Sequence, residues 1–364
     1  MLAFQLGIRA FGDWYLAVRS ELGFLQTVER VVYVKTCGGH RKSYLVTLSD
    51  IFGMERAFGR ITAKMAYKLI ACKKLLFATL DEHIFSFVCF SLVRSILGKN
   101  TVALFLRPEQ CFLPGKLRYR LKWLLFRALR HLPGLTVVAI TPFDVVARYA
   151  QVATAGVRDP EYWDLHDGVS VLSPKETSLS AQLRSMAGRK RLCTAVGVLN
   201  AGKGLEFLAD ALEQFPEIKE HTQVVVAGSA NPHTSDVLKK LSATGAVVID
   251  RFLSDAELLS LISTSELIWA CYNPEYDQAS GIFGRAVQLG SVPITREGAV
   301  VSRLAFESGI PFISVRYGVT EQLAEVLIAG RSIVGDQIGP DHGEIGEWRR
   351  TFIEVIKAGL AGRS

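Results

Sequence analysis

Residues 192–204 read LCTAVGVLNAGKG, and this stretch decides the fold class. The apolar run at its start predicts a buried strand, and the glycines that follow it predict a tight loop before a helix. Residues 267–284 read LIWACYNPEYDQASGIFG, which is a second buried strand with a glycine-containing loop and a helix start. In an open α/β sheet such loops lie together at the carboxyl ends of the strands, where ligands bind.

Both loops have the chemistry of a phosphate site. Glycines let backbone N–H groups approach a phosphate closely, and a helix N-terminus adds partial positive charge. Lys203 contributes a cation to the first loop. Residues 197–203 also match the G-x-x-x-x-G-K pattern of a nucleotide-triphosphate P-loop, but Gly204 stands where that motif needs a magnesium-binding hydroxyl. We therefore predict a site for a phosphate-bearing ligand and keep a P-loop-like protein as an alternative.

The rest of the chain alternates between apolar strands and helical stretches, which predicts parallel sheets. We expect two successive Rossmann-like domains with a connection rich in Pro, Ser, Gly and charge between them. A capping box at Ser254–Glu257 predicts a helix start. The strands are expected at 31–35, 75–79, 101–106, 135–140, 192–197, 222–228, 246–250, 267–272, 291–295 and 311–315. The predicted regions are an amphipathic extension (1–28), an N-terminal domain (29–165), a linker (166–190), a C-terminal domain (191–335) and a final loop and helix (336–364).

The composition excludes several classes of protein. The six cysteines are scattered and the histidines are not clustered, so neither a zinc site nor a disulfide framework is expected. The apolar stretch 83–97 is short and contains Arg94, and the first thirty residues interrupt their apolar pattern with charges. We therefore expect no membrane span and no signal peptide, and a cytoplasmic location.

The net charge of +7 is unevenly distributed along the chain. Residues 1–150 hold 22 Lys/Arg and 9 Asp/Glu, whereas residues 151–364 hold 20 and 26. No nucleic-acid-binding signature accompanies the basic half, so we expect no nucleic-acid partner. Residues 116–132 read KLRYRLKWLLFRALRHL and place Leu117, Leu121 and Leu124 on one helical face. This pattern suits an anionic membrane surface. We also expect a crossover helix to pack its leucines on the sheet, and both can hold for the same helix.

The order of these motifs resembles that of GT-B-fold glycosyltransferases, particularly the retaining family 4 type, also called glycosyl transferases group 1. The shared features are the loop at 197–204, a strand ending in Gly228, a D-x-E-L helix start at 255–258, and a helix that ends A-x-x-x-G-x-x-P-I at 286–294. The resemblance covers 190–330 well and 29–150 loosely. It implies two Rossmann-like domains that face each other across a cleft.

The resemblance also implies roles for particular residues. Lys203 would hold the diphosphate of a nucleotide-sugar donor, and Arg251 and Phe252 would lie against the nucleobase. Ser280, Gly281 and Ile282 would offer backbone amides to phosphate or sugar. The resemblance implies no metal and no cofactor besides the donor. The remaining donor-side residues are Gly197 and Gly228 in the second domain, with Gly38 and Gly39 in a G-G-H loop of the first domain.

Three positions depart from the family pattern. Val198 stands where an arginine usually follows the first glycine of the loop. Asp277 and Arg285 stand where the family carries two glutamates. Asp277 can still accept hydrogen bonds from sugar hydroxyls, but a guanidinium only donates. We hypothesise that Arg285 replaces the missing cation and binds the diphosphate, because the planar guanidinium suits phosphate oxygens.

A catalytic acid or base could come from the polar residues after the predicted strand 75–79. These are Asp81, Glu82 and His83, and the histidine titrates in the useful range. Arg107 and Glu109 follow the next strand and have similar standing. We therefore predict His83, Lys203 and Asp277 as the catalytic residues.

These observations favour a metal-independent glycosyltransferase of bacterial surface polysaccharide or glycolipid assembly. Its acceptor would be a saccharide or a lipid-linked sugar, and the enzyme would be cytoplasmic and peripheral on the inner face of the cell membrane. The departures at Val198 and Arg285 leave open a catalytically degenerate GT-B protein that acts as a binding partner. A sugar-nucleotide epimerase with the same fold is a third alternative.

Overall fold

A computed structural model describes residues 29–38, 40–165, 174–329, 333–334 and 342–362. The predicted extension at 1–28 and Gly39 lie outside these residues, as does part of the predicted linker. The chain divides into two compact units. The first comprises Met1–Ala139, Arg148–Gly156 and Ile353–Ser364, and the second comprises Ile140–Ala147 and Val157–Phe352.

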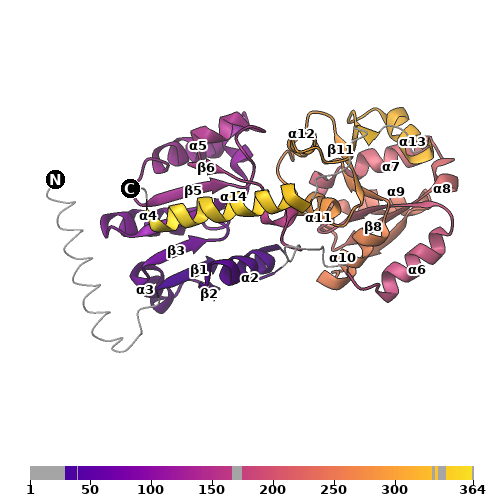
Figure 1. Ribbon diagram of the computed structural model, residues 1–364. Helices are drawn as coiled ribbons and strands as arrows, with labels where there is room; N and C mark the ends of the chain where they lie inside the picture. The colour runs from indigo at the N-terminus through magenta and orange to yellow at the C-terminus, as the bar shows by residue number, and fades with distance from the viewer. Residues whose placement is uncertain (1–28, 39, 166–173, 330–332, 335–341, 363–364) are drawn as a thin grey trace. The chain divides into compact units, whose positions relative to one another are not determined.

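The first unit contains a parallel six-stranded sheet with the order β2-β1-β3-β4-β5-β6. Figure 1 shows its strands together with their connecting helices. The order reverses direction between β1 and β3, so the loops that follow these two strands flank a topological switch point. The strands are β1 (Arg30–Val34), β2 (Glu55–Phe58), β3 (Lys74–Phe77), β4 (Asn100–Phe105), β5 (Leu135–Ala139) and β6 (Ala155–Gly156). The helices between them are α2 (His40–Phe52), α3 (Ala63–Ala71), α4 (Ile84–Ile96), η1 (Pro108–Phe112), α5 (Leu117–Leu129) and η2 (Ala147–Gln151).

The second unit contains a seven-stranded sheet with the order β13-β12-β11-β10-β7-β8-β9. Only β13 is antiparallel among the strands that the structure describes in this sheet. The switch point lies between β7 and β10, whose loops hold the two glycine motifs. The strands are β7 (Arg191–Val196), β8 (Thr222–Gly228), β9 (Val247–Asp250), β10 (Leu267–Ala270), β11 (Val292–Arg296), β12 (Phe312–Val315) and β13 (Ile333–Val334).

The helices of the second unit connect these strands, and Ser254 caps α10 through the predicted box with Glu257. The elements before α10 are η3 (Pro160–Tyr162), α6 (Ser178–Ala187), η4 (Ala201–Lys203), α7 (Leu205–Gln214), α8 (Ile218–His221), η5 (Pro232–Thr234) and α9 (Ser235–Ala243). From there on the helices are α10 (Asp255–Thr264), α11 (Gly281–Gln288), α12 (Val300–Glu307), α13 (Thr320–Ala329) and α14 (His342–Ala361).

The second sheet is buried on both faces. Cys193 and Ala195 of β7 face one hydrophobic cluster with α7 and α13. The alternate residues Leu192 and Val196 face another cluster with α6 and α10. Two buried faces explain why β7 reads as a continuous apolar run, since an alternating pattern needs one polar face.

The apolar stretch 83–97 forms α4 and contains a fully buried arginine. The Arg94 guanidinium donates to the carbonyl oxygens of Leu69 and Cys72 at 2.8 Å and of Asn100 at 2.6 Å, and its Nε donates to Thr101. The side chain therefore links α4 to the end of α3 and to β4. No helix among the described residues is long and apolar enough to cross a membrane.

Helix α14 contributes residues to both units. Trp348 contacts Tyr162 and Phe352 contacts Trp163 within the second unit. Further along the helix, a Cβ atom at Gly359 would lie 2.8 Å from the Val102 side chain within the first unit. The sequence predicted a final loop and helix over 336–364, and the structure begins this helix at His342.

The expectation that the α5 leucines pack on the sheet is wrong. Leu117, Leu121 and Leu124 are 71%, 55% and 50% exposed, whereas Phe126 and Lys122 are buried. The Lys122 ammonium lies 2.9 Å from Asp81 and 3.0 Å from the side-chain oxygen of Gln110. The Lys122–Asp81 ion pair therefore lies on the buried side of α5, and the leucine face of the helix is exposed.

Candidate active site

Glycines bring the loops after β7 and β8 into backbone contact. Gly197 has φ +101° and Gly228 has φ +147°, which are conformations that L side chains rarely adopt. A Cβ atom at Gly228 would lie only 1.8 Å from the carbonyl oxygen of Gly197. Gly228 is therefore required for packing. Its predicted part in donor binding would be indirect, because it lets the Gly197 loop come close.

The first glycine loop is pressed against the chain that follows β10. The Trp269 indole donates to the carbonyl oxygen of Lys203 at 2.8 Å, and the Asn273 amide donates to that of Gly202 at 3.0 Å. A Cβ atom at Gly204 would lie 2.4 Å from the carbonyl oxygen of Cys271. The two glycine motifs, far apart in sequence, therefore form one surface within the second unit, as the topology predicted.

Lys203 and Ser280 meet at the hydroxyl of Tyr272. The Lys203 ammonium lies 3.5 Å from this hydroxyl and 4.7 Å from the centre of the ring. The Ser280 hydroxyl lies 2.6 Å from the same oxygen and caps α11 by accepting from the Phe283 amide. A Cβ atom at Gly197 would lie 3.8 Å from both the Lys203 ammonium and the Ile282 side chain.

This cluster holds a cation that lacks a counter-charge. Burial lowers the pKa of Lys203, with a smaller opposing effect from Tyr276. Within the described part of the chain, no carboxylate lies within ion-pair distance of its ammonium. An anion placed here would gain both this charge and the N-terminus of α11. The predicted roles of Lys203, Ser280, Gly281 and Ile282 stay predictions that this geometry supports.

Glu161 is a site residue that the sequence reasoning missed. A Cβ atom at Gly281 would lie 1.8 Å from its carboxylate oxygen, and one at Gly284 would lie 2.5 Å from its carbonyl oxygen. The two glycines at the start of α11 therefore make room for η3 to pack closely. Burial and the nearby Asp159 raise the pKa of Glu161 and Arg285 opposes them, which leaves the pKa at about 8.

Arg285 lies on the same side of α11 and is held by acidic side chains. Its guanidinium pairs with both oxygens of Asp164 and lies 3.9 Å from Glu161. Burial alone would lower the pKa of Arg285, but Asp164 and Glu161 raise it. Gln288 adds a 2.6 Å hydrogen bond to the carbonyl oxygen of Glu161. These contacts fix η3 on α11, and the hypothesis that Arg285 binds the diphosphate stays untested.

Asp277 also has partners of its own. One carboxylate oxygen accepts from the Val300 amide at 2.8 Å and lies 3.2 Å from Arg296. The residue therefore holds the N-terminus of α12 beside the loop that leads to Ser280. Its predicted role toward the sugar would fall to the other oxygen of the carboxylate.

The predicted base-binding residues follow β9. Arg251 pairs with Glu257 at 2.6 Å, and this hydrogen bond, with those from Ser254, lowers the pKa of Glu257 to about 2. Phe252 is 72% exposed. An exposed ring beside a fixed guanidinium suits stacking against a planar base, and this role stays a prediction.

In the first unit, His83 caps α4 without a side-chain hydrogen bond. The residue is 7% exposed, and its ring lies 5.4 Å from the Tyr33 ring and 5.6 Å from the Phe77 ring, centre to centre. Burial, helped by Lys35, lowers the pKa of His83 to about 4, so the ring is neutral at pH 7. Neither ring nitrogen has a hydrogen-bond partner among the described residues. The side chain is therefore neutral, and its predicted catalytic role stays a prediction.

The other polar side chains that follow β3 and β4 already have ion-pair or hydrogen-bond partners. Asp81 pairs with Lys122 and accepts from the Leu106 amide at 2.8 Å. Glu82 pairs with Arg41, and Glu109 accepts from the Tyr149 hydroxyl at 3.0 Å. Gly38 is exposed, and a Cβ atom there would meet nothing within 4 Å. Of the predicted trio at 81–83, His83 alone keeps its polar atoms without partners within the described chain.

Comparisons with known proteins concern the fold. No family model matches this sequence, and no curated protein matches it. Solved structures do match across both units. A trehalose-6-phosphate synthase structure from E. coli, bound with UDP-2-fluoro glucose, has a TM-score of 0.59 at 12% identity and covers 92% of this chain and 99% of its own. The chain has the GT-B fold.

Two further structures with the GT-B fold agree over similar lengths. Anabaena Alr3699/HepE, solved in complex with UDP and glucose, has a TM-score of 0.57 at 14% identity and covers 92% of this chain and 94% of its own. WaaG, described as a glycosyltransferase involved in lipopolysaccharide biosynthesis, has a TM-score of 0.51 at 13% identity and covers 92% and 95%. The predicted pair of Rossmann-like domains and the resemblance to GT-B glycosyltransferases are thus confirmed at the level of the fold.

Proposed function

We propose that the protein is a glycosyltransferase that moves a sugar from a nucleotide-diphosphate-sugar to an acceptor. The observation that carries this proposal is the cluster of Lys203, Tyr272 and Ser280 at the switch point of the second sheet. It combines a half-buried lysine with no carboxylate at ion-pair distance among the described residues, a helix N-terminus and glycine loops, which together suit a diphosphate.

In the proposed reaction, negative charge grows on the leaving nucleoside diphosphate as the glycosidic bond breaks. Lys203 and the first amides of α11 stabilise this charge, so no metal is required for that purpose. The acceptor hydroxyl loses a proton as it attacks. The neutral imidazole of His83 could accept that proton, because its nitrogens are without partners in the described chain.

The acceptor that we propose is a saccharide or a lipid-linked sugar in bacterial surface polysaccharide or glycolipid assembly. The exposed leucines of α5 and the basic residues around them support peripheral contact with an anionic membrane. The protein would act at the inner, cytoplasmic face of that membrane.

The test is release of nucleoside diphosphate from UDP-, GDP- and dTDP-sugars by the purified protein, with and without membrane-lipid extract. We expect release from one donor, and a decrease of about 10²- to 10⁴-fold for His83→Gln, the usual contribution of a positioned base. His131→Gln, at an exposed position, is the matched control. Donor binding without turnover under every condition would contradict transfer.

A second candidate is a GT-B protein that binds a nucleotide sugar without turnover. Two observations favour it. Val198 is 62% exposed where the resemblance leads us to expect an arginine, and Arg285 is already paired with Asp164. Donor binding without release of nucleoside diphosphate is the outcome that would select this candidate.

A further inference from the structure

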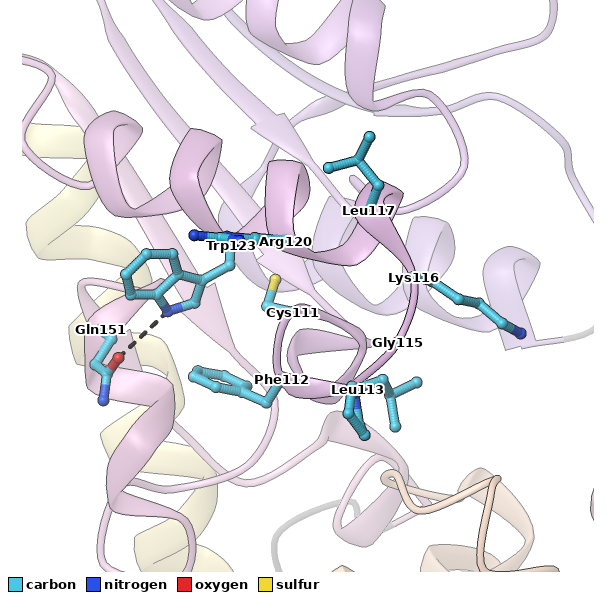
Figure 2. A pocket seen from close by; sticks show the side chains of 10 residues that line it. Cys111, Phe112, Leu113, Gly115, Lys116, Leu117, Arg120, Trp123 and Gln151 are labelled. Carbon is cyan, nitrogen blue, oxygen red and sulfur yellow. Dashed lines mark hydrogen bonds between the residues drawn. The ribbon is translucent and has the colours of Figure 1, made fainter.

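A pocket of about 660 Å³ lies within the first unit, between η1, the start of α5 and the end of η2. Its volume is in the range of small-molecule sites, about 300–1,000 Å³. It plays no part in the proposed donor site, which belongs to the second unit. Figure 2 shows its lining. The lining residues are Cys111, Phe112, Leu113, Pro114, Gly115, Lys116, Leu117, Arg120, Trp123 and Gln151.

The walls of this pocket are mainly apolar and are fixed in place. The Trp123 indole donates to the side-chain oxygen of Gln151 at 3.3 Å (Figure 2). The Arg127 guanidinium lies 4.9 Å from the centre of the Trp123 ring. The Phe112 ring stacks on Tyr149 at 6.1 Å. Burial raises the pKa of Cys111 to about 12, so its thiol is an uncharged part of the wall.

The charges that line the pocket are all positive. Lys116 and Arg120 are exposed, and no lining residue is acidic. Within the described chain, the guanidinium of Arg120 has no ion-pair partner. An apolar hollow lined by cations complements a molecule that has an apolar chain and an anionic head.

The pocket opens beside the exposed leucines of α5. Leu117 lines it, and Leu121 and Leu124 continue the same helix face at spacings of four and three residues. Isolated exposed leucines are common, but a contiguous set next to an apolar hollow marks an interaction site. A membrane surface in contact with this face would present lipid chains and phosphates to the pocket.

We propose that this pocket binds one phosphate-headed lipid, with the chain against Trp123 and Phe112 and the phosphate at Arg120. This site goes beyond the membrane-surface contact proposed above, because a surface contact needs many lipids at once and no pocket. It also does not depend on sugar transfer.

The probe is 11-bromoundecyl phosphate, used as a monomer below its micelle concentration with the full-length protein. Bromine quenches tryptophan fluorescence on contact, and Trp123 is the tryptophan that lines the pocket. We expect saturable quenching, which Trp123→Phe abolishes. The uncharged 11-bromoundecanol should bind at least about tenfold more weakly, because it lacks the charge that Arg120 recognises.

Two pairs of variants separate the pocket from a simple surface effect. Arg120→Glu should weaken binding about tenfold or more, whereas Arg118→Glu makes the same charge change at an exposed position outside the pocket. Leu117→Ser should weaken binding of the monomer, whereas Leu124→Ser should not. Equal effects within either pair, or quenching that persists in Trp123→Phe, would overturn the proposal. Loss of transfer activity with intact quenching would concern the proposed function alone.

Discussion

At the scale of single residues, backbone contact explains why several glycines occupy their positions. Gly228 has the clearest constraint, since its φ is +147° and a Cβ atom would collide with the Gly197 carbonyl oxygen. We predict that Gly228→Ala lowers the free energy of unfolding by about 3 kcal/mol or more, because both strain and overlap must be relieved. Denaturant unfolding of the purified variant measures this value.

Gly346→Ala is the matched control. Gly346 lies within α14 and a Cβ atom there meets nothing within 4 Å. Alanine favours a helix over glycine by about 1 kcal/mol, so this variant should be as stable as the parent or more stable. Similar losses in both variants would show that the contact between the β7 and β8 loops is not a strong constraint.

Glu161 is predicted to make stability depend on pH. Its ordinary pKa is 4.5 and its folded value is about 8, so the folded state holds a proton that the unfolded state has lost between these values. The free energy of unfolding should therefore fall as pH rises through this window, by at most about 1.4 kcal/mol per pH unit. The comparison is urea unfolding at pH 5, 6, 7 and 8.

Glu161→Gln should flatten this dependence, because the amide stays neutral at every pH. Glu354→Gln, on the exposed side of α14, is the control and should leave the slope unchanged. The His83 imidazole has the opposite effect on the free energy of unfolding at lower pH. Folding lowers its pKa from 6.5 to about 4, so the free energy of unfolding decreases as the pH falls through that range. A slope that is the same in Glu161→Gln and in the parent would contradict the proton on Glu161.

At the scale of elements, long apolar strands were predictable and short edge strands were not. The runs at 192–197 and 222–228 are buried on both faces, so their composition alone indicated β7 and β8. Strand β2 is a four-residue edge strand with three exposed positions, and β6 has two residues. Such strands form because a neighbouring strand offers hydrogen bonds, which no local pattern records.

The candidate site was also predictable only in part. Its glycines, Lys203 and Ser280 belong to local motifs, and the strand order brings these motifs together. Glu161 was not predictable, because it lies at the end of the predicted N-terminal domain and contacts Gly281, which is 120 positions away. The orientation of α5 was missed because a buried Lys122 paired with Asp81 is contrary to the usual exposure of lysine.

Helix α5 carries the prediction about membranes. Its leucine face is exposed, so we expect the protein to float with vesicles that contain acidic phospholipid and not with neutral vesicles. Replacing Leu117, Leu121 and Leu124 together by serine should decrease the bound fraction several-fold without loss of folding, because these side chains are exposed. The matched control replaces exposed Phe85 and Ile96 of α4 by serine. Equal flotation of both variants and the parent would contradict the assignment of this face.

At the scale of the whole molecule, two Rossmann-like units with different chemistry make up the GT-B fold. The second unit offers a half-buried lysine and a helix N-terminus at its switch point. The first unit offers a histidine at its own switch point, whose ring nitrogens have no hydrogen-bond partner among the described residues, and a basic, leucine-bearing helix. Each unit thus has a chemistry of its own, which is consistent with the proposed transfer from a phosphate-bearing donor to a separate acceptor.

The central claim is that the cluster of Lys203, Tyr272 and Ser280 binds the diphosphate of a nucleotide sugar. Isothermal titration calorimetry of the parent and of Lys203→Ala with UDP, GDP and dTDP tests it most directly, with the exposed Lys239→Ala as control. The account predicts that one nucleotide binds the parent and Lys239→Ala equally, and binds Lys203→Ala roughly 10- to 100-fold more weakly. Unchanged affinity in Lys203→Ala, or no binding of any of these nucleotides to the parent, would contradict it.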